Sequence, residues 1–380
     1  MPYNDPAIEE VPSPPKLSFP QVGIMTTGKH INHGIPSGKK ARIFRELTSH
    51  AHAKGIILFF FYPEDVDLKK RRITGFTPTG TRSWVRSIYP FPDIVYNRVM
   101  YRGIEKQQLV SHILQQFIND NRVKLFNTRY LDKWEVYQAL SKSENHPINM
   151  PESALFTKES LRKFINKYDE VFLKPRSGSK GVGIVKVVKS HNGFLCARAE
   201  GKNRTWRYVK SSEALFPHLM ALKVRPGHYL IQEGIDMARD DDRVFDIRCQ
   251  VQKNGQGEWV FTGAGIRIAA RNHFVTHIPN GGQAASYKDT MYKVFGWNKE
   301  ELTMFDNYLK TTLIYAAQTL EKELNLQLGI LSLDVAVNKA GQIAILEINS
   351  KPASFDEDEI RSQHFQYLTD YFLYMSINKN

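Results

Sequence analysis

The chain has 380 residues, enough to bury a large core, and its 42% hydrophobic and 24% charged residues are ordinary for a globular protein of two or three packed lobes. Lysine and arginine exceed aspartate and glutamate by 52 to 39, a net charge of +13, so the overall field attracts anions. A nucleotide, an anionic polymer or a membrane surface fits that sign. No basic run exceeds the four residues at 69–72, which excludes a dedicated basic arm, and we do not expect nucleic acid as a partner.

Cysteine content and hydropathy exclude two further classes of protein. Cys196 and Cys249 are too few for a disulfide framework and indicate a reducing compartment. The N-terminus lacks the charged start and apolar core of a signal peptide. The longest apolar run, at 56–62, falls far short of the ~20 residues that span a bilayer, so we expect a cytoplasmic chain without a membrane span.

The first third of the chain predicts a small α/β lobe. A proline-rich leader at 1–20 precedes a strand at 22–25, a helix at 39–54 and a strand at 56–61, a pattern that predicts a parallel strand pair. Further strands are expected at 72–76, 83–88 and 94–96, then a helix at 106–118 and an apolar segment at 123–126. We therefore place the N-terminal lobe at 21–125.

Two segments of this lobe resemble ligand sites. Residues 33–40 resemble a phosphate-binding P-loop, but three residues instead of four separate the glycines and Lys40 stands where a Ser or Thr belongs, so we interpret them as a loop before a helix. The triplet Tyr96, Asn97 and Arg98 ends a predicted strand, where ligand sites of α/β proteins lie. A contact between lobes explains the triplet equally well.

A glycine-rich hairpin is predicted in the middle of the chain. Asp132 is a suitable N-cap for a helix that opens with Lys133. A strand at 170–175 carries Lys174 near its end, and a strand follows at 184–188. The loop between them exposes backbone N–H groups to an anion, although a mobile loop is the simpler interpretation, and contains Ser177, Gly178, Ser179, Lys180, Gly181 and Gly183.

Charged residues lie on the strands that follow. A strand at 229–232 runs into Glu233, Gly234 and Ile235. On the strand at 244–251, Asp246 and Arg248 are two apart and share a face, which fits either a functional site or a structural ion pair. Arg267 lies on another strand, a tight turn is expected at 280–282, and amphipathic helices are expected at 301–325 and from the acidic segment after 356 to 372.

The hairpin at 329–352 has the most specific chemistry. If Asn338 pairs with Ile343, then Asp334 lies opposite Glu347, and Asn349 shares their face. Directly opposed carboxylates repel unless a cation lies between them. Two carboxylates and an amide are ligands that Mg²⁺ accepts, although pairing with a Lys or Arg, or a register slipped by one residue, would also fit.

The order of these pieces resembles the ATP-grasp superfamily over residues 126–354. Within it, the segments FLKPRSGSKGVGI, FDIRCQVQKNGQGEW, GAGIRIA and LSLDVAVNKAGQIAILEINSKP are similar to the YheC/YheD group of endospore coat-associated proteins. The resemblance implies an α/β (α+β) ATP-grasp fold in which two α+β subdomains, at 126–225 and 226–380, clasp ATP after the N-terminal lobe.

The resemblance also implies a role for each candidate residue. Lys133 and Lys174 would hold ATP phosphates under the loop of residues 177–183. The backbone of Gln232, Glu233, Gly234 and Ile235 would read adenine, and Asp246 would bind ribose. Arg248, Arg267 and Lys174 would act on the transferring phosphate and the substrate carboxylate. The Mg²⁺ ligands would be Asp334, Glu347 and Asn349.

By the same resemblance, the protein would be an ATP- and Mg²⁺-dependent ligase. It would join a small-molecule or peptide carboxylate to an amine or another nucleophile through an acyl phosphate. The alternative is a spore coat-associated structural or polyanion-binding protein that retains the fold without catalysis. Spore coat proteins as partners, a spore-associated location and a homodimer stay open.

Overall fold

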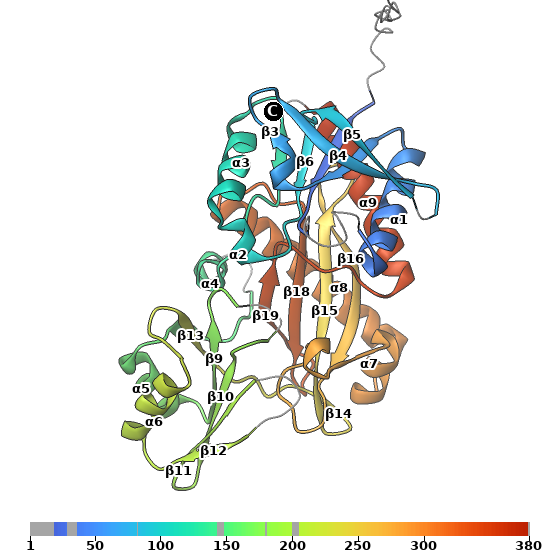
Figure 1. Ribbon diagram of the computed structural model, residues 1–380. Coiled ribbons are helices and arrows are strands. Elements are labelled where there is room, and N and C mark those ends of the chain that lie inside the picture. Colours follow the sequence, from blue (N-terminus) through green and yellow to red (C-terminus); the bar gives the residue numbers. More distant parts are fainter. Residues whose placement is uncertain are drawn as a thin grey trace, which may run out of the picture.

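The computed structural model describes residues 19–28, 36–81, 83–142, 148–178, 181–199 and 205–378, and within them the strands form three sheets (Figure 1). The predicted leader therefore lies almost entirely outside the described residues, as do Ser179 and Lys180. The first sheet lies at the top of the molecule in Figure 1, and the second lies at the lower left, beside β18 and β19.

The first sheet has the strand order β3-β4-β2-β1-β6-β7, with β5 paired to β4. Its parallel pairs β1–β2, β1–β6 and β6–β7 confirm the predicted parallel pairing. Helix α1 covers it because Phe44, Leu47 and Ala51 recur at three and four and bury one stripe, with Phe44 stacked on Phe60. The elements are β1 Gln21–Met25, α1 Gly38–Ala53, β2 Ile57–Phe61, β3 Val66–Asp67, β4 Arg72–Thr79, β5 Ser83–Pro90, β6 Ile94–Asn97, α2 Arg102–Glu105, α3 Gln108–Asn119 and β7 Lys124–Phe126.

The second sheet is antiparallel, in the order β12-β11-β10-β9-β13-β8. Helices α5 and α6 pack on it, and α5 begins at a capping box between Thr157 and Ser160, a helix that we did not predict. The elements are α4 Lys133–Ser141, β8 Ser153–Leu155, α5 Lys158–Lys167, β9 Glu170–Pro175, β10 Val185–Ser190, β11 Gly193–Arg198, β12 Arg207–Val209, α6 Ser212–Ala221 and β13 Tyr229–Glu233. The glycine-rich hairpin is confirmed as β9 and β10.

The third sheet has the order β17-β16-β15-β18-β19, with β14 on β15. Helix α8 starts at a capping box of Asn298 and Glu301 and buries its apolar stripe against the sheet, as predicted. The elements are β14 Arg239–Asp240, β15 Arg243–Lys253, β16 Trp259–Ile268, β17 Gln283–Ala285, α7 Tyr287–Phe295, α8 Lys299–Glu323, β18 Ile330–Val337, β19 Ile343–Asn349 and α9 Asp358–Ile377.

Helix α9 joins the first and third sheets. Its buried Phe365, Tyr371 and Phe372 share one core cluster with Phe126 of β7 and Ile330 of β18. Helix α9 thus continues five residues beyond its predicted end at 372. Because this last part of the chain packs in the core of the first lobe, the predicted boundaries between the domains stay predictions. No helix in the described part of the chain is long and apolar enough to cross a membrane.

Candidate functional site

The hairpin of β18 and β19 places two carboxylates side by side. Asp334 pairs with Glu347 and Ser332 with Asn349, as predicted. The predicted pairing of Asn338 with Ile343 is wrong, because Val337 pairs with Ile343 instead. A β-bulge shifts the register by one residue between Val335 and Asp334. Because of this bulge, Asp334 still pairs with Glu347.

Asp334 is the most enclosed charge of the site. It is 3% exposed, and Arg248 of β15 donates from Nη1 to its Oδ1 at 2.9 Å, while Arg267 of β16 lies 3.8 Å away. Burial alone would raise the pKa of Asp334, but the positive charges around it, Arg248 foremost, hold that pKa at about 2. Asp334 is therefore ionised. The pairing of a hairpin carboxylate with an arginine, which the sequence left open, is present, and the partner of Arg248 is Asp334 of the neighbouring strand.

Glu347 faces a lysine from another element. Lys133, at the start of α4, lies 2.7 Å from Glu347 and also donates to the carbonyl of Gly178 at 3.1 Å. Asp132 caps that helix by accepting from the backbone N–H groups of Trp134 and Glu135, which confirms the predicted N-cap. Burial opposes ionisation of Glu347, but the charge of Lys133 lowers its pKa.

The oxygen donors here fit a hard divalent cation. Asp334 Oδ2 and Ser332 Oγ are buried and lack a hydrogen-bond partner within the described residues, and Glu347 and Asn349 supply a carboxylate and an amide on the same face. Such an orphaned buried oxygen calls for a donor or a cation. In the described part of the chain no group of three or more His, Cys, Asp or Glu could hold a metal, so a cation here would need the amide and other ligands.

A cavity of about 390 Å³ lies between the second and third sheets, next to these carboxylates. It brings together most of the predicted nucleotide residues. Those that line it are Lys174, Gln232, Glu233, Gly234, Ile235, Asp246, Asp334 and Glu347. Lys133 lines a small neighbouring pocket, which shares Lys174, Gln232 and Glu347 with the cavity. Arg248, Arg267, Asn349 and the described residues of the glycine-rich loop do not line the cavity.

Lys174 carries a buried positive charge into this cavity. It lies on β9, where its ammonium group donates to the side-chain oxygen of Gln232, and Gln232 donates in turn to Ser153 at 2.9 Å. Burial lowers the pKa of Lys174 to about 8, although Glu347 works in the opposite direction. The ammonium group of Lys174 is therefore bonded to a neutral amide, that of Gln232, which an anionic ligand could replace.

The glycine-rich loop is anchored at its base. Arg176 donates to Asp132 at 3.2 Å and to the carbonyl of Gly227 at 3.0 Å. Gly181 adopts a positive φ of 70°, and a Cβ there would lie 3.1 Å from Asn280 and 3.3 Å from His277. The loop after β16 thus meets the tip of the glycine-rich hairpin.

Several cavity residues escaped sequence analysis. Phe172 shares a face of β9 with Lys174, so strand alternation could have identified it. Lys186 lies 2.6 Å from Glu170 and above the ring of Phe172 at 5.4 Å. No pattern signals Phe274, Thr276 and His277, because they lie in an irregular loop.

Two of these groups affect titration in the cavity. Thr276 donates its hydroxyl to Asp246. Burial, and then the negative charge of Asp334, raise the pKa of Asp246 to about 7. Burial lowers the pKa of His277, so this imidazole is neutral at pH 7. Asp246 is therefore the group of this pair that can change its hydrogen-bonding role near neutral pH.

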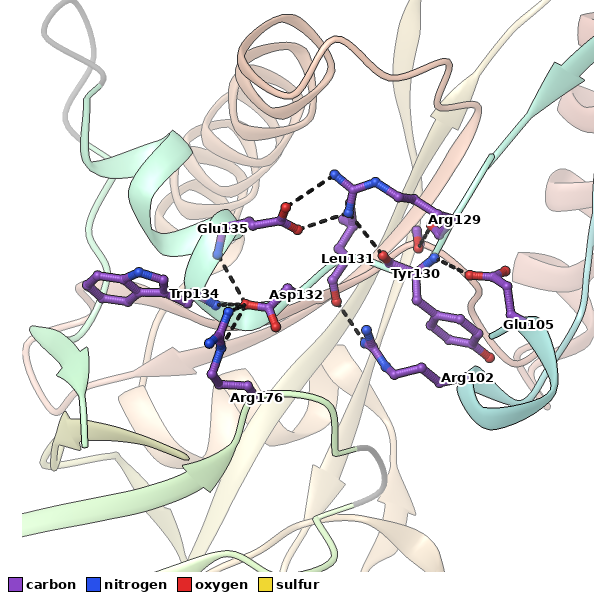
Figure 2. A network of polar contacts seen from close by, with 10 residues as sticks. Arg102, Glu105, Arg129, Tyr130, Leu131, Asp132, Trp134, Glu135 and Arg176 are labelled. Carbon is purple, nitrogen blue, oxygen red and sulfur yellow. Dashed lines mark hydrogen bonds and ion pairs between the residues drawn. The ribbon is translucent and has the colours of Figure 1, made fainter. Parts of the chain in front are cut away.

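A polar network ties the first lobe to the base of the glycine-rich loop (Figure 2). Arg102 donates to the carbonyl of Leu131 at 2.7 Å, and Glu105 accepts from the backbone of Tyr130 at 2.8 Å. The same short segment continues to Asp132 and its partner Arg176. The triplet at 96–98 belongs to this boundary: Asn97 donates to the Thr128 carbonyl and Arg98 to Ser354, so the interpretation as a contact between lobes is confirmed.

Comparison with known proteins agrees with this arrangement. A family model described as YheC/D like ATP-grasp matches residues 122–375. The chain is similar to the endospore coat-associated protein YheD of Bacillus subtilis (strain 168), with 26% identity over 335 residues, 88% of this chain and 72% of the relative.

Two solved structures share the fold. The D-cycloserine synthetase DcsG aligns with a TM-score of 0.54 and 14% identity over 92% of this chain and 99% of its own. The VanG D-Ala:D-Ser ligase from Enterococcus faecalis aligns with a TM-score of 0.51 and 13% identity over 95% of this chain and 100% of its own. The predicted fold, an ATP-grasp domain after a small α/β lobe, is confirmed. With two thirds of its length matched by one model, the chain belongs to the YheC/D-like ATP-grasp family.

Proposed function

We propose that this protein is an ATP- and Mg²⁺-dependent ligase that joins a carboxylate to an amine, or to another nucleophile, through an acyl phosphate. One observation carries the proposal: opposed Asp334 and Glu347 share a cavity with the buried cation Lys174. Two carboxylates suit a divalent cation, and the adjacent cation suits a phosphate chain. The ligase fold of the neighbours supports the same class of reaction.

Each part of a nucleotide has a complementary surface in the cavity. The end of β13, from Gln232 to Ile235, offers backbone groups for adenine, beside the ring of Phe172. Asp246 can accept from ribose hydroxyls. Lys174 exchanges its bond to Gln232 for a phosphate oxygen, and Lys133 reaches the phosphates from α4. The glycine-rich loop, with Ser177, Gly178, Ser179, Lys180, Gly181 and Gly183, would cover them.

Mg²⁺, held by Asp334, Glu347 and Asn349, would neutralise phosphate charge during transfer. A carboxylate oxygen of the substrate forms a bond to the γ-phosphorus, and the bond to the β-phosphate oxygen breaks, releasing ADP. Arg248 and Arg267 lie beside Asp334 and stabilise the negative charge on the transferring group. The nucleophile then adds to the acyl carbon of the mixed anhydride, loses a proton, and phosphate departs.

A structural protein that retains the fold without catalysis is the second candidate. The name of its relative YheD supports a spore-associated location, with spore coat proteins as partners. The buried ion pairs favour the enzyme, because removing such charges from water costs free energy that an apolar core would not. A protein with only a structural role gains nothing from that cost.

Calorimetric titration of ATP into the purified chain, with and without Mg²⁺, tests the proposal. We expect saturable, Mg²⁺-dependent binding that Lys174→Ala abolishes. The control is Lys189→Ala, which removes an exposed lysine from the neighbouring strand β10 and should leave the affinity unchanged. Absence of binding to the folded wild type would favour the structural role.

A second measurement separates a ligase from a simple nucleotide-binding protein. Release of ADP should require both a carboxylate and a nucleophile, because only then does the acyl phosphate break down productively. A panel of carboxylates and amines, small molecules and peptides alike, identifies the pair. ADP release that is independent of both cosubstrates would contradict the ligase mechanism.

A further inference from the structure

The carboxyl ends of the parallel strands in the first sheet form an edge that the proposed reaction does not use. The backbone N–H of Thr26, just after β1, donates to the Phe61 carbonyl at the end of β2, and the N–H of Arg98 donates to the Met25 carbonyl, both at 2.9 Å. The three strand ends are therefore adjacent. Ligands of parallel α/β sheets bind at this edge of the sheet.

Two cations from different elements meet at this edge. Lys40, in the first turn of α1, donates from its ammonium group to the carbonyl of Thr27, and Arg98 donates to the hydroxyl of Ser354 at 3.2 Å. Burial, and then the positive charge of Arg98, lower the pKa of Lys40 to about 8. The two positive charges are thus close enough to repel each other.

No carboxylate in the described part of the chain compensates this pair. Of the acidic residues that follow Ser354, Asp356 pairs with Lys39 and Asp358 pairs with Arg361. Glu357 lies against Gly265 and acts through its charge on Arg267. The first turn of α1 contains no acidic residue, although the start of a helix favours negative charge. Two partly buried cations therefore lie at the same edge of the sheet, at a place where the start of a helix also attracts an anion.

The same edge is connected to the proposed reaction centre. Ser354 follows Asn349, the last residue of β19, by five positions. The carboxylate of Glu357 packs against Gly265, two residues before Arg267 on the same face of β16. One short segment, 354–357, therefore runs from Arg98 in the first lobe to the strand that carries Arg267.

We propose that Lys40 and Arg98 form an anion subsite for the substrate, which binds a carboxylate or phosphate group other than the reacting carboxylate. The inference rests on the proposed function, and it narrows the substrate to acidic molecules that carry at least two anionic groups. Arg98 supplies a planar guanidinium with several donors, and Lys40 supplies a point charge beside it. An oxyanion there would replace the contacts to Ser354 and Thr27 and relieve the repulsion.

The test compares matched ligands that differ by one anionic group. Binding of succinate and succinamate, glutamate and glutamine, and phosphoserine and serine is measured by calorimetry on the full chain with Mg²⁺ and ADP. We expect at least one charged member to bind about tenfold more tightly than its neutral partner, as for one charge-assisted hydrogen bond. The preference should disappear in the double variant Lys40→Met, Arg98→Gln.

The control is the double variant Lys39→Gln, Arg42→Gln, which removes the same charge from exposed positions of the same helix. It should retain the preference. If the first double variant does not fold by circular dichroism, Lys40→Met alone replaces it, since its apolar side chain still packs on Phe44 and Tyr62.

Three results would overturn the subsite: no charge preference in the wild type, a preference that survives in the Lys40 and Arg98 variant, or an equal loss in the control. Titration of ATP with Mg²⁺ into the same proteins separates the two proposals. A wild type that does not bind ATP overturns the proposed function, whereas intact ATP binding without a charge preference overturns only the subsite.

Discussion

Two hairpins from different sheets line the cavity, and they hold their charges in opposite ways. Every residue of β18 is buried, between β15 and β19, and its Asp334 is fixed by Arg248 and Arg267. On β9 and β10 the buried charge is a cation, Lys174, and its hydrogen-bond partner is the neutral amide of Gln232. The carboxylates of the third sheet are thus held in place by ion pairs. The cation of the second sheet, Lys174, has only the neutral amide of Gln232 as its hydrogen-bond partner among the described residues, and an anion could replace that amide.

Lys133 links the two hairpins. It contacts Glu347 of β19 and the carbonyl of Gly178 at the base of the glycine-rich loop. A nucleotide that takes over Lys133 would therefore release Glu347 for a metal and free the loop at once. If the proposed reaction takes place here, we expect the anionic side, fixed by its ion pairs, to set the position of the reaction and the cationic side to respond to the ligand.

The anionic side should be the more sensitive to charge removal. Asp334→Asn keeps the shape of the side chain but leaves Arg248, itself 7% exposed, without its carboxylate. Removing one partner of a buried ion pair costs roughly 3 kcal/mol or more. We expect the free energy of unfolding, measured by chemical denaturation, to fall by about that amount.

The double variant Asp334→Asn, Arg248→Met separates ion pairing from packing. Because the unpaired charge is then gone, it should recover a large part of the lost stability. An unchanged midpoint for the single variant would show that the pair does not stabilise the fold.

Glu347 tests the function of the same side with less cost to folding. Glu347→Gln removes one anionic ligand, so we expect a normal circular dichroism spectrum and a roughly 100-fold loss of Mg²⁺-dependent ATP affinity. The control is Glu321→Gln, which breaks a comparable pair with Lys253 at 2.7 Å on the far side of the third sheet. Calorimetry showing unchanged affinity for Glu347→Gln would exclude Glu347 as a metal ligand.

Sequence analysis succeeded where periodicity and order carry the information. The strand pattern predicted the parallel lobe, the hairpins and the pairing of Asp334 with Glu347. That last pairing was predicted from a wrong turn. Next to the turn the register of the two strands differs by one residue from the expected one, and the β-bulge shifts it back before Asp334. A bulge leaves no signal in the alternation of apolar residues. The predicted turn was therefore wrong although the predicted pairing of Asp334 with Glu347 was right.

Cavity residues on irregular segments could not be predicted. Thr276 and His277 reach Asp246 and the cavity from a loop whose course depends on tertiary contacts, among them that of Gly181. The partner of Arg176 was missed for the same reason, since Asp132 lies 44 residues away in the sequence. Such contacts depend on the packing of the lobes, which sequence order does not encode locally.

On the cationic side, pH should modulate binding. Because the pKa of Lys174 is about 8, ATP affinity should fall about tenfold between pH 7 and 9 as the ammonium group loses its proton. The stability of the protein without ligand should change in the opposite direction. Between about pH 8 and pH 10.5 the lysine is protonated more often in the unfolded chain than in the folded one, so the free energy of unfolding rises with pH.

The control for this pH effect is Lys174→Arg, because a guanidinium stays charged throughout the range. Its ATP affinity, measured by calorimetry at pH 7, 8 and 9, should be nearly flat. A wild type with equally flat affinity would show that Lys174 does not titrate at the phosphates.

The smallest effect is expected where the glycine-rich loop meets the loop after β16. Gly181→Ala places a methyl group 3.1 Å from Asn280 at a φ of 70°, and strain of about 1 kcal/mol corresponds to a roughly fivefold weaker ATP affinity. Gly296→Ala has a φ of 66° but no neighbour within 4 Å, so it reproduces the backbone strain without the contact. If both variants bind ATP as the wild type does, the two loops do not act together. If only Gly181→Ala weakens binding, their contact is part of the closed nucleotide site.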